Sequence, residues 1–270
     1  MTPQRHAEKH PEIWRRFSPH QTLLRYAWYL GIVAVAVWSI SALDISWFFL
    51  LDAHLQAMDM AVRMWSPEMG YFRKLMTPLL ETIHIATLGT VVTVLVAFPV
   101  AFLAARNTTF NALTWFIGRF ILVASRSVNT VVWGLLFVAI FGPGPLAGIW
   151  AITFRSVGFL GKLVAEAIEE IDAGVVEAVE STGASRLQVL WIGILPQVLP
   201  VIYGTTVYRW DINIRESSVL GFVGAGGIGI VLYAAINQFM WQEVSVILIA
   251  VFAVVILSEF VSAAVRQRIT

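Results

Sequence analysis

The sequence predicts an all-α protein that crosses a membrane about six times. Its 270 residues are 58% hydrophobic and 13% charged, whereas a soluble domain is about half apolar and about a quarter charged. Several apolar runs approach the ~20 residues that a membrane-spanning helix needs. The chain has no cysteine, which excludes disulfides and thiolate metal sites. Together these features indicate a polytopic membrane protein.

The first apolar run, Tyr26–Leu43, is expected to be the first transmembrane helix, with an extension past Asp44 to Leu51 as the alternative. The polar, basic residues before it and its length argue against a cleaved signal peptide, whose apolar core is shorter. The mixed segment Asp52–Thr77 is expected to lie outside the membrane, partly helical and along the interface.

Five further spans are expected after this segment. They are predicted at Thr82–Ala105, within Ala112–Phe141 from about Phe120 onward, at Leu146–Ala165, at Gln197–Phe222 and at Val244–Val265. Pro99 inside the second span is tolerated in a membrane helix, where it usually introduces a kink. Residues 79–270 are therefore interpreted as the core, and residues 1–78 as a tail, a first helix and an outer segment.

The basic residues predict the orientation of the chain, because cytoplasmic loops carry the excess of lysine and arginine. With the N-terminus inside, the outer segments hold only Arg63, Arg73 and Lys74. The inner segments hold Arg5, Lys9, Arg15, Arg16, Arg25, Arg106, Arg119, Lys162, Arg186, Arg266 and Arg268. Both termini and the polar loop at 166–196 are therefore expected in the cytoplasm.

That loop contains local signals for two short helices. Asp172 is a candidate N-cap for the first helix, and Gly183 is expected to end it. Ser185 is a candidate cap for the second helix, with Gln188 at the N3 position of a capping box. Two short helices joined at a glycine predict a rigid projection that a soluble partner can bind.

The same stretch resembles the coupling loop of ABC-importer permeases. The family pattern is Glu-Ala-Ala, three residues, Gly, nine residues, then Ile-x-Leu-Pro; Val179 replaces the second alanine and Gly193 replaces the isoleucine. The resemblance implies that ATPase coupling involves Glu177, Ala178, Gly183, Ala184, Leu195 and Pro196. An ordinary polar connector between two membrane helices is the alternative.

Further segments look like the phosphonate and phosphite importer permeases, from about Leu79 to the C-terminus. They are Val132–Ala139, Gly142–Gly148, Gly158–Leu163, Gly193–Pro200, Tyr208–Arg215 and Val223–Gly229. The resemblance implies an ABC type I importer permease core with an extra N-terminal helix, in a bacterial inner membrane. It also implies a second permease chain as a homodimer, ATPase subunits that bind ATP and Mg²⁺, and a periplasmic or lipid-anchored solute-binding protein.

The chain offers no catalytic arrangement, metal-ligand set or nucleic-acid motif. It has no P-loop pattern, so ATP hydrolysis is expected in another subunit. The glycines in 224–229 satisfy Gly-x-Gly-x-x-Gly, but they follow a membrane helix and not a strand, which rejects a dinucleotide site. Gly224, Gly226, Gly227 and Gly229 are interpreted as a bend, either simply packed or flexible near an outer gate.

Charges within the fifth span are costly unless they face a partner or a cavity. Asp211 and Arg215 are four residues apart and can pair, which leaves Arg209 as the less compensated cation. The hypothesis is an anion pathway lined by Arg209, Arg215, Asn213, Arg126 and Asn129. The alternative is an internal salt-bridge cluster that orients the helix.

Two other functions remain open at this point. The chain could serve as an ABC permease for another small solute, such as an amino acid. It could also be a channel or secondary carrier that needs no ATPase. The coupling-loop pattern favours an ATP-driven importer of phosphonate-type or phosphite-type anions.

Overall fold

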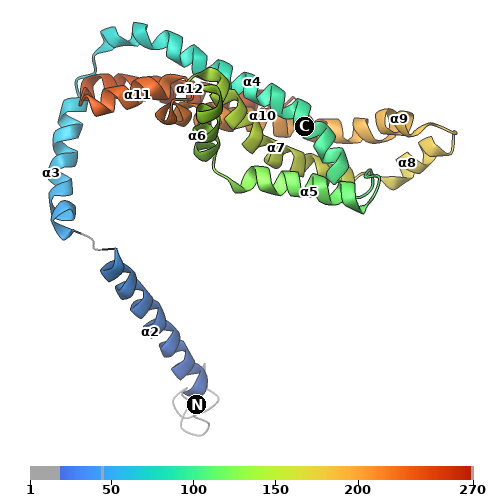
Figure 1. Cartoon of the computed structure of the whole chain (residues 1–270), viewed down its shortest axis with the longest axis horizontal. Helices are drawn as coiled ribbons and strands as arrows, with labels where there is room; N and C mark the ends of the chain where they lie inside the picture. The colour runs from blue at the N-terminus through green and yellow to red at the C-terminus, as the bar shows by residue number, and fades with distance from the viewer. Residues whose placement is uncertain (1–18, 44–45, 269–270) are drawn as a thin grey trace, which may run out of the picture. The chain divides into compact units, whose positions relative to one another are not determined.

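The computed structural model describes residues 19–43 and 46–268, and every regular element in these ranges is a helix (Figure 1). The chain divides into two compact units between Asp59 and Met60. The sequence boundary at 78/79 falls inside the long helix α4, Phe72–Ala104.

The first unit contains helix α2, Pro19–Ala42, and most of α3, Trp47–Met64. α2 is long and apolar enough to cross a membrane, as predicted, although it begins before Tyr26. α3 is a separate helix, so the alternative of one span continuing to Leu51 is wrong. The large apolar side chains of α2 are exposed within the chain, which suits contact with lipid.

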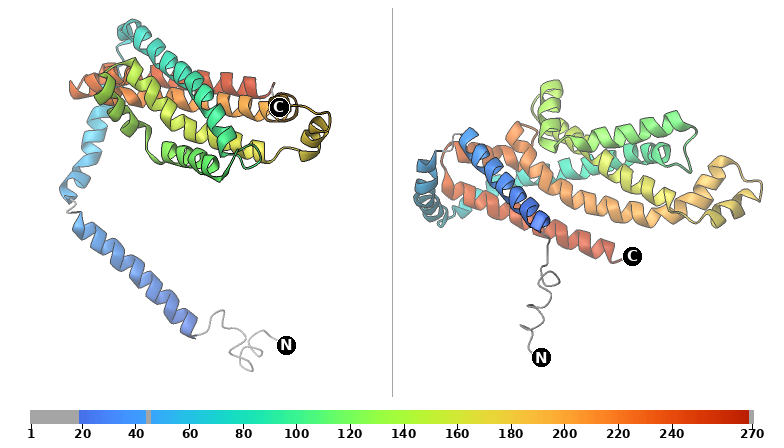
Figure 2. Two further views of the ribbon diagram at one scale, coloured as in Figure 1. Left: turned by 45° about the vertical axis from the view of Figure 1, so that its right-hand side comes forward. Right: turned by 90° about the horizontal axis from the view of Figure 1, so that it is seen from below.

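The second unit is a bundle of long helices with shorter ones packed on it (Figure 2). α7 lies at its centre and packs against α4, α5, α6 and α10. Small residues on α7 permit this close packing: a Cβ at Gly158 would lie 2.5 Å from the carbonyl oxygen of Leu122 on α5. The remaining bounds are η1 Met69–Tyr71, α5 Ala112–Ser127, α6 Thr130–Phe141, α7 Pro145–Glu169, α10 Leu195–Leu220, η3 Gly221–Val223, α11 Ile228–Asn237 and α12 Trp241–Arg266.

The second predicted span begins earlier than the sequence indicates. Residues 72–81, expected mostly outside the membrane, form the start of α4. Leu75 and Leu79 are buried in a cluster with apolar residues of α11 and α12. Tertiary packing therefore lets α4 begin before the residue at which hydropathy alone places its start.

The segment Ala112–Phe141, predicted as one long segment, is two helices bent by 95°. The break falls between Ser127 and Thr130. Asn129 caps the new helix, since its side-chain Oδ1 accepts a hydrogen bond from the Val131 N–H at 3.0 Å. Five helices in the described ranges are long and apolar enough to span a membrane, or six if this bent pair is one span, in agreement with about six predicted.

The glycine-rich bend after α10 is confirmed. Gly224, Gly226 and Gly227 have φ angles of 83°, 89° and 76°, a region that favours glycine. The start of α4 holds the bend in place: Glu81 Oε1 accepts from the Gly227 N–H at 3.1 Å, and Thr82 Oγ1 accepts from the Ile228 N–H at 2.8 Å. These bonds make the bend a fixed turn in this structure. That the bend is flexible near an outer gate stays a prediction.

Candidate functional site

The polar loop forms a projection at one end of the second unit, built from α8 (Ala173–Glu180), α9 (Arg186–Gln188) and the π-helix η2 (Val189–Ile194) (Figure 1). Asp172 caps α8 as predicted, with Oδ1 accepting from the Gly174 N–H at 2.8 Å. Gly183 has a φ of 78° in the turn between the helices. The Ser185 N–H donates to Gln188 Oε1 at 2.8 Å, which confirms the predicted capping box.

Side-chain bonds fix the base of this projection. Gln197 Oε1 accepts from the Asp172 N–H at 3.0 Å, and Gln197 Nε2 donates to the Gly193 carbonyl at 2.6 Å. A Cβ at Gly193 would lie 3.6 Å from Val176 Cα, so α8 packs closely on η2 where the family pattern has isoleucine. The projection is therefore tied to the start of α10 by side-chain bonds.

Of the predicted coupling residues, Glu177 is exposed on α8, and the other five fall into two groups. Ala178, Gly183 and Ala184 line one hollow between α8 and α9. Leu195 is buried in the bundle core and Pro196 is exposed at the start of α10, so these two belong to the base. Exposed apolar side chains around the projection, which the sequence pattern does not single out, are Val175, Leu187, Trp191 and Ile192.

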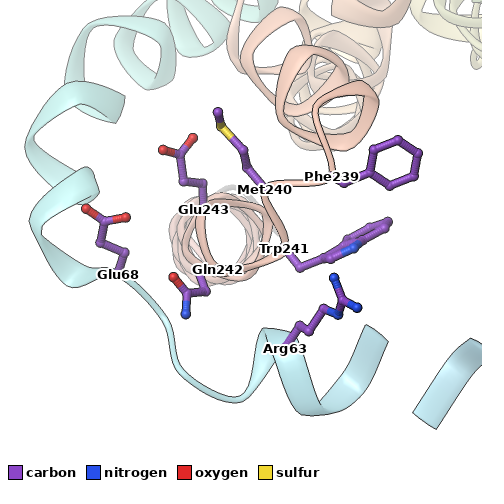
Figure 3. A pocket seen from close by; sticks show the side chains of 7 residues that line it. All are labelled: Arg63, Glu68, Phe239, Met240, Trp241, Gln242 and Glu243. Atoms are coloured by element: carbon purple, nitrogen blue, oxygen red, sulfur yellow. The ribbon is translucent and has the colours of Figure 1, made fainter. Parts of the chain in front are cut away.

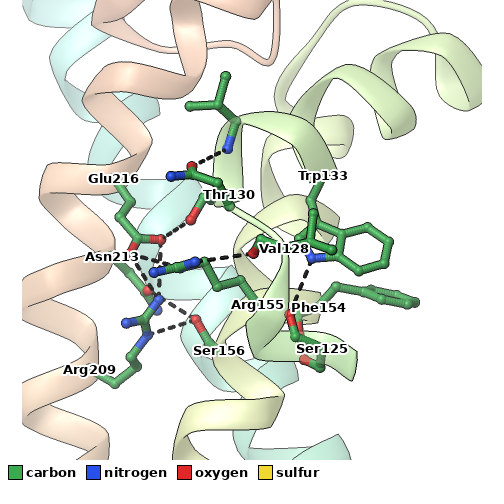
Figure 4. Close-up of polar contacts among 12 residues, drawn as sticks. Ser125, Val128, Thr130, Trp133, Phe154, Arg155, Ser156, Arg209, Asn213 and Glu216 are labelled. Carbon is green, nitrogen blue, oxygen red and sulfur yellow. Dashed lines mark hydrogen bonds and ion pairs between the residues drawn. The ribbon is translucent and has the colours of Figure 1, made fainter. Parts of the chain in front are cut away.

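A second polar site lies inside the bundle and centres on Glu216 (Figure 4). Arg209 Nη2 lies 3.1 Å from both carboxylate oxygens of Glu216. Thr130 Oγ1 donates to Oε2 at 2.6 Å, and Arg155 Nε lies 3.5 Å from Oε1. Three helices, α6, α7 and α10, thus converge on one carboxylate.

This geometry corrects the expectation that Arg209 is the less compensated of the two arginines in α10. The Arg209 side chain is 4% exposed, pairs with Glu216 and donates from Nε to Ser156 Oγ at 2.9 Å. Glu216 is seven residues further along α10, two helical turns away, so the pairing rule for residues four apart did not indicate it. The predicted pair of Asp211 and Arg215 is confirmed.

Asn213 is a fully buried connector. Its Oδ1 accepts from Ser156 Oγ at 3.0 Å, and its Nδ2 donates to Thr90 Oγ1 at 2.8 Å. Arg209 and Asn213 are therefore brought together through Ser156 of α7. Arg215 is separate from them: its partner Asp211 also accepts from Ser258 Oγ of α12 at 2.6 Å.

Arg126 and Asn129 flank the break between α5 and α6, and both are exposed. The break leaves backbone carbonyl groups without partners inside a helix, and such groups need other donors. Arg155 Nη1 donates to the Val128 carbonyl at 3.1 Å, and Trp133 Nε1 donates to the Ser125 carbonyl at 3.3 Å. Arg155 thus connects the helix break to Glu216.

Sequence reasoning assigned no role to Arg155 and did not single out Thr130 or Ser156. A usable signal for Arg155 was present, because an isolated charge within a predicted span needs a partner. Its partner, Glu216, is 61 residues away along the chain, so only the fold shows the pairing.

A smaller pocket lies at the turn between α11 and α12 (Figure 3). It is lined by Arg63, Glu68, Phe239, Met240, Trp241, Gln242 and Glu243. None of the predicted pathway residues reaches it. Within the described ranges, no group of three or more His, Asp or Glu side chains is placed to hold a metal ion.

Comparisons with known proteins show which family this architecture resembles. Residues 97–270 match the family described as the binding-protein-dependent transport system inner membrane component. The chain is 37% identical over 264 residues to the phosphite transport system permease protein PtxC of Stutzerimonas stutzeri, covering 97% of this chain and 95% of that protein. It is 39% identical over 196 residues to the phosphate-import permease protein PhnE of Mycolicibacterium smegmatis, covering 72% of this chain and 37% of that protein.

A solved inward-facing structure of the MetNI methionine ABC transporter has a similar fold, with a TM-score of 0.63 at 22% identity, over 73% of this chain and 96% of that one. The fold class predicted from the sequence, an ABC importer permease core, is therefore confirmed. The chain belongs to the family of inner membrane components of binding-protein-dependent transport systems. It is a multi-pass membrane protein whose relatives are transport permeases.

Proposed function

We propose that this chain is the membrane-spanning subunit of an ATP-driven importer for small phosphorus oxyanions, of the phosphite or phosphonate type. An external binding protein would deliver the anion, and the chain would conduct it into the cytoplasm. The relatives named for phosphite and phosphate transport support this substrate class, because both solutes are tetrahedral phosphorus oxyanions.

The projection formed by α8, α9 and η2 carries the coupling part of the proposal. It combines a hollow lined by Ala178 and Gly183 with exposed apolar side chains such as Leu187 and Trp191. Exposed apolar groups gathered on a rigid, capped structure are typical of a protein contact. The partner would be an ATPase subunit that binds ATP and Mg²⁺, and both termini would share its side of the membrane.

The polar site at Glu216 supports an anionic substrate. Two guanidinium groups, Arg155 and Arg209, face one carboxylate, so the cluster carries a net charge of +1. A cation within the membrane lowers the barrier for an anion that must cross an apolar region. The proposed pathway passes this cluster and the exposed residues Arg126 and Asn129, between two copies of the chain.

ATP-driven uptake into proteoliposomes tests the proposal. The chain would be co-purified with an ATPase subunit and combined with a solute-binding protein, and uptake of phosphite, methylphosphonate and phosphate would be measured with and without ATP. We expect uptake that requires ATP and the binding protein, and no competition by methionine. Uptake without nucleotide would indicate a channel or carrier, and competition by methionine would indicate an amino-acid importer.

A further inference from the structure

We propose that Glu216 is a built-in substitute for the transported anion: its carboxylate occupies the oxyanion site, and the substrate displaces it during transport. This inference rests on the proposed function and names the residues that would bind the substrate. The donors are Arg155, Arg209 and Thr130, with Ser156 orienting Arg209.

The donors around Glu216 match the chemistry of a tetrahedral oxyanion. Arginine presents several N–H groups in a fixed fork that suits carboxylate and phosphorus oxygens equally. Arg209 contacts both oxygens of the carboxylate, and Thr130 adds a hydroxyl donor from another direction. A carboxylate has two oxygens, whereas a phosphorus oxyanion offers three or more to the same set of donors.

One N–H donor at the site, on Arg155, has no hydrogen-bond acceptor in the part of the chain that the structure describes. The Nε atom of Arg155 is buried, lies 3.5 Å from Glu216 Oε1, and makes no hydrogen bond within the described residues. Buried N–H groups almost always have a partner, so an unfilled one at a charged cluster points to a further acceptor. A larger anion with an additional oxygen would provide that acceptor.

The broken helix adds a third favourable feature. Thr130 is the first residue of α6, which has 12 residues, so its N-terminus places the positive end of the helix dipole beside the Glu216 carboxylate. Helices broken within the membrane direct their N-termini at anionic substrate groups in other transport proteins. The break between α5 and α6 thereby supplies both a hydroxyl donor and a dipole.

The site is also partly accessible. The side chains of Arg155 and Glu216 are 32% and 20% exposed, while Arg209 is 4% exposed. Asn129 and Arg126, both exposed, border the helix break. Arg209 is therefore the most deeply buried of the three charged groups, and Glu216 beside it is partly exposed.

Anion-dependent thermal stabilisation of the purified full-length chain tests the inference. Glu216→Gln keeps the shape of the side chain and removes the competing charge. We expect phosphite to stabilise Glu216→Gln with an apparent Kd at least about tenfold lower than for the unmodified chain, and chloride to have no such effect. Adding Arg155→Gln to this variant should abolish the gain.

Glu169→Gln is the matched control, because Glu169 is a partly buried glutamate that bonds Arg119 and the Arg106 backbone elsewhere in the bundle. If Glu169→Gln gains phosphite affinity equally, any unpaired arginine suffices and the inference is overturned. A folded Glu216→Gln variant without a gain overturns it as well.

Thr130→Val gives a second measurement if Glu216→Gln does not fold. It removes one neutral donor, and we expect a several-fold higher KM for phosphite in ATP-driven uptake with the turnover per complex nearly unchanged. An unchanged KM would overturn the inference and leave the proposed function intact. Phosphite binding by Glu216→Gln without ATP-driven uptake by the unmodified transporter would instead support the site and refute the proposed substrate.

Discussion

Phe239 occupies a backbone position that glycine usually fills. It has a φ of 56° and follows α11, where its N–H donates to the Ile236 carbonyl at 3.1 Å and the Met240 N–H donates to the Ala235 carbonyl at 3.0 Å. These two bonds define a Schellman motif, whose left-handed residue is most often glycine. A bulky aromatic residue there carries backbone strain of about 1–2 kcal/mol.

We therefore predict that Phe239→Gly stabilises the chain by about 1 kcal/mol, because glycine adopts this φ without strain. Little packing is lost, since Phe239 is 72% exposed and its ring meets that of Trp241 edge-on. Thermal unfolding of the detergent-purified chain measures the change. Phe239→Ala is the control: it loses the ring but keeps the strain, so equal stability of the two variants would refute the explanation.

The two arginines of α10 should differ in their effect on folding. Arg209→Gln removes a buried partner of Glu216 and of Ser156, and breaking a buried pair strands a charge. Arg215 is 47% exposed, and its partner Asp211 keeps a hydrogen bond from Ser258. We expect a several-fold lower yield of monodisperse protein for Arg209→Gln than for Arg215→Gln, measured by size-exclusion chromatography. Pairing by sequence spacing alone predicts the reverse order, and that result would contradict the structure.

At the scale of single elements, the coupling projection depends on the turn at Gly183. Its φ of 78° disfavours side chains, although a Cβ there would meet no atom within 4 Å. Gly183→Val should therefore misplace α8 against α9 through backbone strain and not through collision. We predict that substrate-stimulated ATP hydrolysis by the assembled transporter falls at least several-fold.

Gly183→Asn is the matched control for this turn, because asparagine tolerates left-handed backbone far better than valine does. It should retain most of the stimulated hydrolysis. Equal loss of stimulated hydrolysis in both variants would mean that the ATPase subunit contacts Gly183 directly. Normal hydrolysis in Gly183→Val would show that the turn has no role in coupling.

The projection and the bent helix pair show what a sequence can predict about elements. The projection is specified locally. Asp172, Gly183 and Ser185 each act on backbone within a few residues, so the sequence alone predicts the two helices and the turn between them. The break between α5 and α6 carries one local signal, the Asn129 cap, inside a long apolar run. Its stability comes from Arg155 of α7, which bonds the freed Val128 carbonyl, and this contact exists only in the fold.

The same distinction applies to the polar site. The pair of Asp211 and Arg215 was predictable because both lie on one helical face. The cluster at Glu216 joins residues of α6, α7 and α10, and Thr130 is 86 residues from Glu216. Sequence identified the fifth span as the place where charges matter, but the partner of each charge required the packed bundle.

At the scale of the whole molecule, the proposed coupling requires the projection and both termini to lie on the cytoplasmic side. α4, the bent pair and α7 are three crossings in succession if the bent pair is one span, so the residues before α4 and the projection after α7 fall on opposite sides. Positions 66 and 181 are exposed serines on these two segments. Since the chain has no native cysteine, a thiol reagent would label only the single cysteine introduced at either position.

We predict that Ser66→Cys reacts with a membrane-impermeant thiol reagent added to intact spheroplasts, whereas Ser181→Cys reacts only after the membrane is opened. The basic residues favour this orientation, because the segment containing Arg63 and Arg73 is less basic than the inner loops. Labelling of both cysteines after permeabilisation controls for accessibility. Labelling of both from outside would make the bent pair a re-entrant loop and not a span, and the reverse pattern would place the projection where no cytoplasmic ATPase can reach it.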